Sequence, residues 1–303
     1  MKNQKLSLIA FQKKFATEEA CYQYLYNIRW PDGFVCPKCS HPKGYHIVSR
    51  KLIQCANPEC RYQASVTAGT IMHRTRTPLV KWFLAIYLAA RDKRGISAMA
   101  LAKEIDVTYN TAWLMLHKIR KAMRDRNARY MLSGIVEIDD AFFGSPTRGG
   151  KRGRGTEKSK VICAISLDEE GRPKYLKMEV VSDIKASTLG DFACRNIQAG
   201  SKISSDAYHS YKQLGKDGKF EHEFKHYDPH EDSQFLKWLH TVIGNAKAFI
   251  EGTYHGLGKK HLQSYLEEFC YRFNRRWMQN WLFDRLLVAC TSTPTITYAE
   301  LTA

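Results

Sequence analysis

The chain has 303 residues, with 47 lysines and arginines against 30 aspartates and glutamates, which gives a net charge of +17. This excess favours a polyanionic partner, nucleic acid first, and no apolar run approaches the ~18 residues of a membrane-spanning helix. The apolar run at residues 6–11 is too short for a secretory signal, so we expect a soluble, cytoplasmic, nucleoid-associated protein with no membrane partner. The length predicts a medium-sized domain with small attachments.

Four of the nine cysteines are clustered in the N-terminal segment, residues 1–76. Cys36 and Cys39 form a C-x2-C pair, and fifteen residues later Cys55 and Cys60 form a C-x4-C pair. Zinc prefers four thiolates in a tetrahedron, which two short knuckles joined by a hairpin deliver, so the pattern predicts a zinc ribbon holding a structural Zn²⁺. Its strands are expected at residues 51–54 and 62–66. The alternative reading, unrelated buried thiols, suits the scattered cysteines instead, namely Cys21, Cys163, Cys194, Cys270 and Cys290.

Residues 77–130 are predicted to be helical and to bind DNA. Thr77 is a plausible N-cap with Pro78 at the first helical position, and residues 79–90 are apolar nearly all round. A short helix at 96–105, a tight turn and a second helix from Thr108 then form a helix-turn-helix pattern, whose second helix normally enters the major groove. A helical hairpin that does not touch DNA is the alternative. We expect base contacts from Tyr109, Asn110 and Thr111, and phosphate contacts from Lys118, Arg120, Lys121, Arg124 and Arg126.

The next segment, residues 131–290, alternates strands and helices. Strands are expected at 134–143, 161–167, 175–181 and 202–206, and helices at 186–197 and 235–251. This order predicts a ribonuclease H-like α/β domain within a multi-domain α+β chain, followed by a tail at 291–303. A basic, glycine-rich loop at 146–160 is either a solvated segment or a phosphate-binding one, and its candidate DNA contacts include Arg148, Lys151, Arg152, Arg154 and Lys158.

Two expected strands end on aspartates, Asp139 and Asp206, and the later helix carries a polar stripe. In that helix, apolar residues recur at helical spacing, whereas His240, Lys247 and Glu251 stack along a second stripe that would meet a cleft. Two carboxylates and a histidine could therefore share one metal centre. Because side chains alternate along a strand, Glu137 is expected beside Asp139, and Asp140 on the opposite face.

Together these motifs carry a family resemblance. The zinc ribbon, the helix-turn-helix, Val136-Glu137-Ile138-Asp139-Asp140, Ser205-Asp206-Ala207-Tyr208 and the run from His240 to Arg276 resemble bacterial insertion-sequence transposases of the ISXO-like group, over roughly residues 15 to 280. The resemblance implies a DDE-type transposase that binds the terminal inverted repeats of its element in double-stranded DNA. It further implies cleavage at the element ends and transfer of the 3′ ends to target DNA with Mg²⁺ or Mn²⁺, by a homo-oligomer on the DNA.

By this resemblance Asp139 and Asp206 are the first two catalytic acids, and the third position, usually glutamate, falls on His240. Lys247 follows seven residues later, as in the usual pattern of the group, and is expected to contact the DNA end. An imidazole favours Mn²⁺ over Mg²⁺ relative to a carboxylate, so we interpret His240 as a working variant, the alternative being a catalytically decayed copy. Asn245 is a competing ligand, but it lies about 140° round the helix.

Two other functions are compatible with parts of the chain. A zinc-ribbon DNA-binding regulator would explain the charge and the first 130 residues, yet it has no need for aspartates at the ends of two strands. A metal-dependent RNA nuclease would use a similar acidic site, but a helix-turn-helix indicates duplex DNA.

Overall fold

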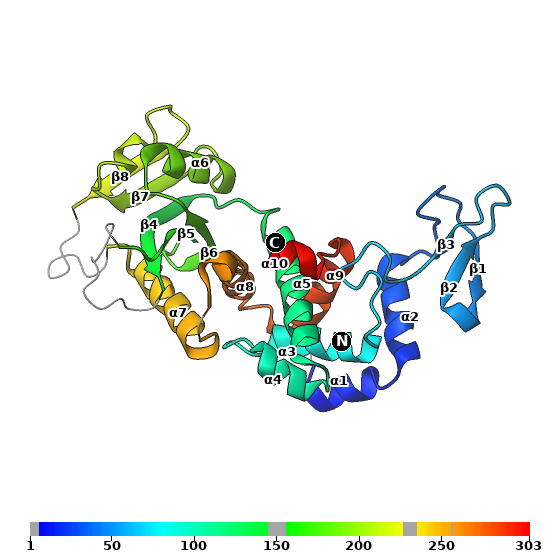
Figure 1. Cartoon of the computed structure of the whole chain (residues 1–303). Coiled ribbons are helices and arrows are strands. Elements are labelled where there is room, and N and C mark those ends of the chain that lie inside the picture. The colour runs from blue at the N-terminus through cyan, green and yellow to red at the C-terminus, as the bar shows by residue number, and fades with distance from the viewer. Residues whose placement is uncertain (1–5, 145–155, 227–234, 256) are drawn as a thin grey trace. The chain divides into compact units, whose positions relative to one another are not determined.

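The computed structural model describes residues 6–144, 156–226, 235–255 and 257–303 (Figure 1). The chain forms two compact units, one made of Met1–Asp125 with Trp277–Ala303 and the other of Arg126–Arg276. The assignment of functions to residues 1–76, 77–130, 131–290 and 291–303 stays a prediction, although residues 277–290 group with the first unit rather than with the sheet.

The first unit is mainly helical, and its core is built from aromatic rings. Phe11 stacks on Tyr87 with ring centroids 4.4 Å apart, and Phe283 meets Phe11 edge to face at 5.4 Å. Residues far apart in the sequence therefore share one core, which explains why the segment after residue 276 belongs here. The helices are α1 (Leu8–Lys14), α2 (Glu18–Arg29), α3 (Leu79–Arg91), α4 (Ala98–Glu104), α5 (Tyr109–Asn127), α9 (Leu282–Ser292) and α10 (Tyr298–Thr302).

The start of α3 differs from the sequence prediction. Pro78, not Thr77, is the N-cap, and its side chain forms no capping bond. Instead the carboxylate of Glu18 accepts the backbone N–H groups of Leu79 at 2.8 Å and Val80 at 3.2 Å. These are amides that a helix cannot satisfy internally, so a residue 61 positions away in the sequence caps the helix.

A three-stranded antiparallel sheet, in the order β1-β2-β3, forms the ribbon. Its strands are β1 (Gly44–Ile47), β2 (Leu52–Cys55) and β3 (Gln63–Ala64). The last two were predicted, whereas β1 was missed because its central residues are exposed and carry no apolar alternation. Gly44 is required at its start, since a Cβ there would lie 2.7 Å from side-chain atoms of Ile53 and Phe34.

The second unit is a five-stranded sheet in the order β6-β5-β4-β7-β8. β4, β5 and β6 are antiparallel neighbours, whereas β7 runs parallel to β4 and β8 parallel to β7. This arrangement is ribonuclease H-like and confirms the predicted fold class; only β8 was not anticipated. The strands are β4 (Ile135–Phe143), β5 (Ser159–Leu167), β6 (Pro173–Val181), β7 (Lys202–Asp206) and β8 (Glu221–Lys225).

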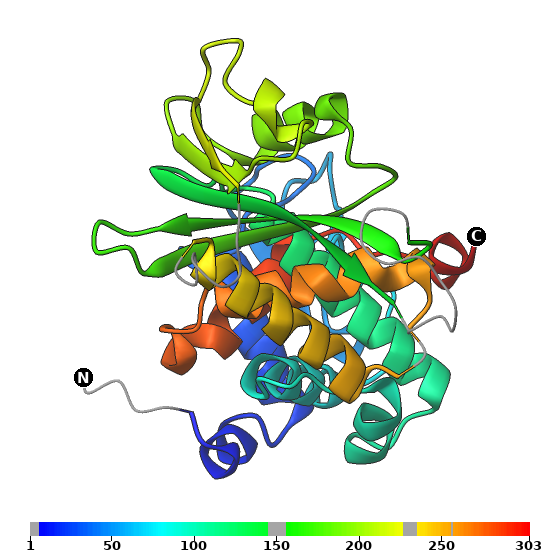
Figure 2. The ribbon, with the colours of Figure 1, turned by 90° about the vertical axis from the view of Figure 1, so that its left-hand side faces the viewer.

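Helices cover both faces of this sheet (Figure 2). Along β4, Val136 and Ile138 pack in one buried cluster with α6 (Ala186–Asn196). Ala141 and Phe143 pack in a second cluster, with α7 (Lys237–Thr253) and α8 (Leu262–Phe273). The two clusters confirm the predicted alternation, which places Glu137 and Asp139 on the α7 side and Asp140 on the α6 side.

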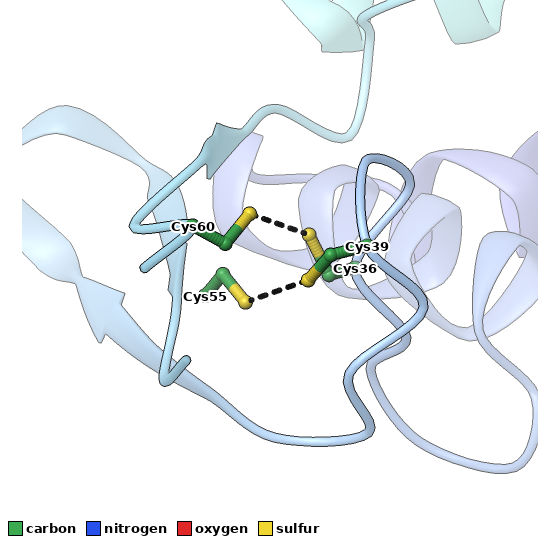
Figure 3. A group of neighbouring side chains, drawn as sticks. All are labelled: Cys36, Cys39, Cys55 and Cys60. Atoms are coloured by element: carbon green, nitrogen blue, oxygen red, sulfur yellow. Dashed lines mark hydrogen bonds between the residues drawn. The ribbon is translucent and has the colours of Figure 1, made fainter. Parts of the chain in front are cut away.

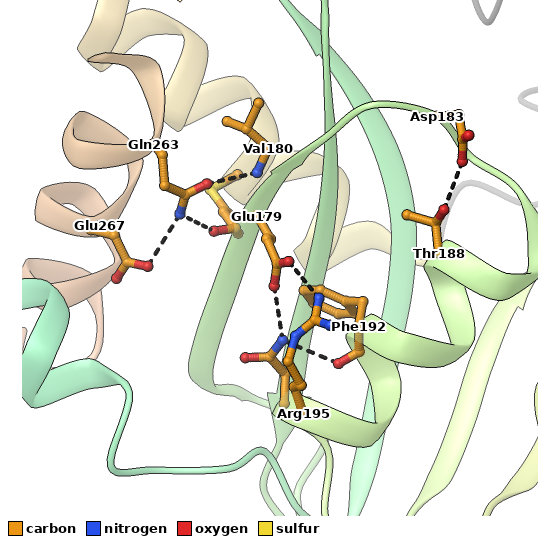
Figure 4. Close-up of polar contacts among 10 residues, drawn as sticks. Glu179, Val180, Asp183, Thr188, Phe192, Arg195, Gln263 and Glu267 are labelled. Carbon is orange, nitrogen blue, oxygen red and sulfur yellow. Dashed lines mark hydrogen bonds and ion pairs between the residues drawn. The ribbon is translucent and has the colours of Figure 1, made fainter. Parts of the chain in front are cut away.

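The edge of the sheet at β6 is closed by the side-chain amides of Gln263 on α8 (Figure 4) and of Asn274, which directly follows α8. Gln263 accepts the N–H of Val180 at 2.7 Å and donates to the carbonyl of Met178 at 3.0 Å. Asn274 makes the same pair of bonds with the backbone of Leu176, at 2.7 and 3.0 Å. The two amides replace a neighbouring strand, so this edge offers no free ladder for pairing at these residues.

Candidate active site and zinc centre

The four clustered cysteines come together at one end of the ribbon (Figure 3). The Sγ atoms of Cys36 and Cys60 are 3.8 Å apart, those of Cys39 and Cys55 are 3.5 Å apart, and all four lie within 4.8 Å of one another. A tetrahedron with Zn–S bonds of about 2.3 Å has edges of about 3.8 Å. The four sulfurs therefore fit a zinc ion, as predicted.

Local backbone geometry forms each knuckle. Ser40 and Arg61, which directly follow the second cysteine of each pair, have left-handed φ values of 59° and 45°. Their amides turn back to the carbonyls of Cys36 and Asn57, at 2.8 and 3.0 Å. Burial raises the pKa of the Cys36 thiol, but the backbone amides of Cys39 and Lys38 outweigh it and lower that pKa to about 7. The first knuckle thus favours the thiolate of Cys36, whereas burial raises the pKa of the Cys55 thiol to about 12.

The other five cysteines were predicted to be small buried hydrophobic residues. Cys21, Cys163, Cys270 and Cys290 are buried, which confirms this prediction. Cys194 is exposed near the end of α6, with its Sγ 3.7 Å from the ammonium of Lys219, so the prediction is wrong there.

In the second unit, two adjacent parallel strands bring the predicted acids together. Ile138 on β4 is aligned with Ser205 on β7, so Asp139 and Asp206 follow as the next residues of the two strands. Asp206 ends β7 as predicted, whereas β4 continues past Asp139 to Phe143, so the prediction that Asp139 ends its strand is wrong. Neighbouring strands lie about 4.8 Å apart and aligned residues of parallel strands point to the same face. Both carboxylates consequently lie on the α7 side of the sheet.

Glu137 fixes where α7 begins on this face. Its Oε2 accepts the backbone N–H of Leu239 at 3.1 Å, one of the amides in the first helical turn that has no partner within the helix. The side chain is buried, and burial raises the pKa of its carboxyl, opposed by the Leu239 amide and by His240. Because Leu239 precedes His240, this contact places the imidazole beside Asp139.

His240 contacts the first acid directly. Its Nε2 lies 3.2 Å from Oδ2 of Asp139, with side-chain exposures of 35% for His240 and 18% for Asp139. The hydrogen bond to Asp139 raises the pKa of His240 against its partial burial, and the charges of Glu137 and Asp206 add to the effect. Asp206 is thus within electrostatic reach of the imidazole. The ligand atoms of Asp139, Asp206 and His240 are more widely spaced than those of the cysteines. Among the described residues, the four cysteines are the one group whose ligand atoms form a compact cluster.

Lys247 lies further along the same face. Its ammonium is 5.9 Å from the ring centroid of Phe143, which is four residues after Asp139 on β4. At ~3.3 Å per strand residue, Phe143 is ~13 Å from Asp139. Lys247 is half-buried, whereas Asn245, the competing ligand, is exposed.

The predicted base-contacting residues lie at the start of α5. Tyr109 and Asn110 are exposed and Thr111 is half-buried. The hydroxyl of Thr108 accepts the N–H of Thr111 at 3.3 Å, which confirms the predicted cap. Asp106, with a left-handed φ of 50°, makes the turn between α4 and α5. The local geometry of a helix-turn-helix is therefore present.

The predicted phosphate contacts on α5 are less accessible than the sequence suggested. Arg120 is only 2% exposed, because it lies on the packed side of a helix whose middle is buried nearly all round, and the prediction that it binds phosphate is wrong for this conformation. Lys121 pairs with Asp125 at 2.7 Å, and half-burial lowers the pKa of Lys118. Arg124 is exposed.

Other basic residues lie elsewhere. Arg148, Lys151, Arg152 and Arg154 fall outside the described residues, while Lys158 is half-buried at the edge of β5. Arg275 is buried and donates to Asn127 at 3.0 Å, and Arg276 donates to the backbone of Pro173 and Lys174. These two arginines therefore make contacts within the second unit.

Sequence reasoning gave no role to the support behind the acids. The hydroxyl of Tyr211, which is completely buried, donates to Asp140 at 3.3 Å. The buried Ser205 hydroxyl lies 2.9 Å from Nε2 of His222. One sequence signal pointed to this support: strand alternation placed Asp140 on the face of the sheet opposite Asp139. Tyr211 and His222 come from segments in which the sequence predicted no helix or strand.

Sequence comparisons agree with this architecture. Residues 131–274 match the family model described as the ISXO2-like transposase domain, and residues 16–63 match the transposase zinc-ribbon domain. A zinc ribbon in one chain with a ribonuclease H-like sheet that carries acids on adjacent strands defines a transposase. The chain belongs to the ISXO2-like transposase family.

One relative spans nearly the whole chain. A Halobacterium salinarum protein, described as an uncharacterized protein in transposable element ISH50, is 25% identical over 280 residues, which cover 85% of this chain and 91% of the relative. Within the described residues, no helix combines the length and apolar character needed to cross a membrane.

Solved structures give only distant similarities. The crystal structure of the Mos1 mariner paired end complex with Mn has a TM-score of 0.28 and 13% identity, covering 65% of this chain and 74% of that one. The Mos1 transposase paired-end complex with left transposon end has a TM-score of 0.20 and 12% identity, covering 61% and 73%. TM-scores this low do not establish a shared fold, so the strand order of this chain carries the fold assignment.

Proposed function

We propose that this transposase binds the terminal inverted repeats of its insertion sequence in double-stranded DNA, hydrolyses the phosphodiester bond at each element end and transfers the 3′ ends to target DNA. The observation that carries the proposal is the position of Asp139 and Asp206 on the adjacent parallel strands β4 and β7, with His240 in contact with Asp139. A DNA-binding regulator has no use for such an arrangement.

Asp139, Asp206 and His240 would hold catalytic Mg²⁺ or Mn²⁺. Two carboxylates suit either ion, and the imidazole shifts the preference toward Mn²⁺. When bound, such ions polarise the phosphoryl oxygens and activate the attacking oxygen. His240 ligates only as the neutral imidazole, so it must release its proton before it can bind the ion.

The remaining residues of the site would bind and orient DNA. Glu137 holds the start of α7 and therefore the position of His240. Lys247, on the same face of the sheet, provides a positive charge for a phosphate near the element end. Lysine cannot ligate a cation while it is charged, so its loss should weaken DNA engagement without affecting metal binding.

DNA recognition would begin at α4 and α5. Tyr109 and Asn110 are exposed at the start of α5, where helix-turn-helix proteins contact bases, and Thr111 lies beside them. Lys118 and Lys121 would contribute phosphate contacts only after small rearrangements, because one is half-buried and the other is paired. Arg152 and Arg154 remain candidate phosphate ligands on sequence grounds. A homo-oligomer on the DNA, working at the nucleoid in the cytoplasm, would bring two element ends together.

The experiment uses labelled duplex DNA from the flanks of the gene itself. Wild-type protein with Mn²⁺ is expected to bind the inverted repeats and nick their ends, and Asp206→Asn to bind equally but not to nick. Asp217→Asn, an exposed aspartate of the same unit, controls for the change of charge.

Three outcomes separate the candidate functions. Binding without nicking by the wild type, in Mg²⁺ and in Mn²⁺, would indicate a regulator or a catalytically decayed copy. Nicking by Asp206→Asn at the wild-type rate would contradict the assignment of the acids. Preferential cleavage of RNA would favour the nuclease reading.

A further inference from the structure

A chain of hydrogen bonds that passes along the α6 side of the sheet links the two strands that carry the acids. Oδ1 of Asp139 accepts the backbone N–H of Asp140 at 2.8 Å, and Oδ1 of Asp140 accepts the hydroxyl of Tyr211 at 3.3 Å. Tyr211 donates its backbone N–H to the carbonyl of Tyr208 at 3.0 Å. The N–H of Tyr208 in turn reaches Oδ1 of Asp206 at 3.2 Å.

The two acids are therefore the ends of one continuous series of hydrogen bonds, which we call the bracket. It begins on β4 at Asp139, crosses to the 3₁₀ turn η3 (Tyr211–Gln213) and returns to β7 at Asp206. Tyr211 is its central member, because it is the only residue in the bracket that touches both the β4 side, through its hydroxyl, and the β7 side, through its backbone.

The environment of Tyr211 makes the bracket rigid. The side chain is 0% exposed and packs in the cluster formed with α6, and the ring of Tyr208 lies edge to face with it at 6.4 Å. The Ser205 hydroxyl, which donates to the carbonyl of Asp206 at 2.8 Å, adds a second support. A buried phenol with a carboxylate partner has few other conformations available.

We propose that Tyr211 is a positioning residue that sets the separation and orientation of the Asp139 and Asp206 carboxylates for the catalytic metal ions. This inference rests on the proposed roles of those two acids as metal ligands. Each acid directs one carboxylate oxygen into the bracket. The partners of metal ligands typically change metal affinity or activity by ~10–100-fold when they are lost.

The chain offers a matched control for this contact. The hydroxyl of Tyr254 donates to Glu268 at 3.3 Å, the same length as the bond from Tyr211 to Asp140, and both tyrosines are buried in the second unit. Glu268 lies on α8, whereas the acids Asp139 and Asp206 lie on β4 and β7. A tyrosine-to-phenylalanine change removes one equivalent hydrogen bond at each place while retaining the ring.

The experiment measures the Mn²⁺ concentration for half-maximal nicking of labelled element-end DNA, together with the thermal midpoint of each variant. Tyr211→Phe is expected to need ~10-fold more Mn²⁺, with the maximal rate largely restored at saturating metal. Tyr254→Phe should lose similar thermal stability but keep the wild-type Mn²⁺ dependence. An unchanged Mn²⁺ dependence of Tyr211→Phe would overturn the inference.

Asp140→Ala tests the same contact from its other end, and covers the case in which Tyr211→Phe does not fold. It should raise the Mn²⁺ requirement as Tyr211→Phe does, and the double variant should raise it no further, since both changes break one bond. Independent, multiplying shifts would contradict the bracket.

Failure of the proposed function would look different. If Asp206→Asn nicks DNA like the wild type, the acids are not the metal ligands. If Asp206→Asn is inactive while Tyr211→Phe and Asp140→Ala retain the wild-type Mn²⁺ dependence, the metal site stands and the positioning role fails.

Discussion

The cysteine cluster and the acids on β4 and β7 are both candidate metal centres, but they are built in opposite ways. The cysteines come from a stretch of 25 residues, Cys36 to Cys60, and their four sulfurs lie within 4.8 Å of one another. The acids and His240 come from three elements spread over about a hundred residues, and a hydrogen bond between His240 and Asp139 occupies part of their ligand set. A structural site is closed by local chain geometry, whereas a catalytic site stays open and depends on distant supports.

The largest effect is expected when the four-cysteine site loses its zinc ion. Zinc binding to such knuckles contributes on the order of 10 kcal/mol to folding, so removal of the ion or Cys55→Ser should unfold the ribbon. The sheet unit, which contains none of the four cysteines, should retain its fold. Circular dichroism with zinc quantification checks this, and a metal content well below one zinc per chain in freshly purified protein would contradict it.

The next effect concerns the third ligand of the open site. His240→Ala should lower Mn²⁺-dependent nicking by more than ~100-fold, since a direct ligand should matter more than its supporting partners. His240→Glu should remain active and shift the preference from Mn²⁺ toward Mg²⁺, because it restores a hard anionic ligand. Full nicking by His240→Ala in Mn²⁺ would send the search for a third ligand to Asn245 or Glu251.

A smaller effect is expected where the support of that ligand is removed. Glu137→Ala takes away the acceptor for the Leu239 amide and should lower nicking by ~10–100-fold. Glu137→Gln keeps an acceptor oxygen of similar reach and should recover most of this loss. Equal activity of the two variants would show that the start of α7 does not depend on the contact.

The two centres also differ in how far the sequence predicts them. Cysteine spacing alone indicates the zinc site, because a knuckle is a local structure. Asp206 was located by the end of its strand and both acids by the family resemblance, and alternation along β4 placed Glu137 and Asp140 on their correct faces.

Contacts between residues far apart in the chain could not be predicted from the sequence. Glu18 caps α3, Gln263 closes β6 and Tyr211 reaches Asp140, and each of these pairs is at least 61 residues apart. The burial of Arg120 was missed for a related reason: a cationic residue on a helix is usually assigned to the surface, and only packing shows which side is covered.

The smallest effect tests the sheet that carries the open site. Gln263→Ala leaves the Val180 amide and the Met178 carbonyl without their partner and should lower the free energy of unfolding by about 1–3 kcal/mol. Gln213→Ala, at an exposed position of the same unit, is the control. Urea denaturation measures both, and equal stabilities would contradict the role of the amide in closing the edge.

Anomalous diffraction from crystals containing Zn²⁺ and Mn²⁺ would show whether one chain holds two metals in two differently built centres. We expect a zinc peak among Cys36, Cys39, Cys55 and Cys60. We also expect a manganese peak between the carboxylates of Asp139 and Asp206, in contact with His240. Manganese bound elsewhere, or absent from these carboxylates at saturating concentration, would show that the two acids do not form a metal centre.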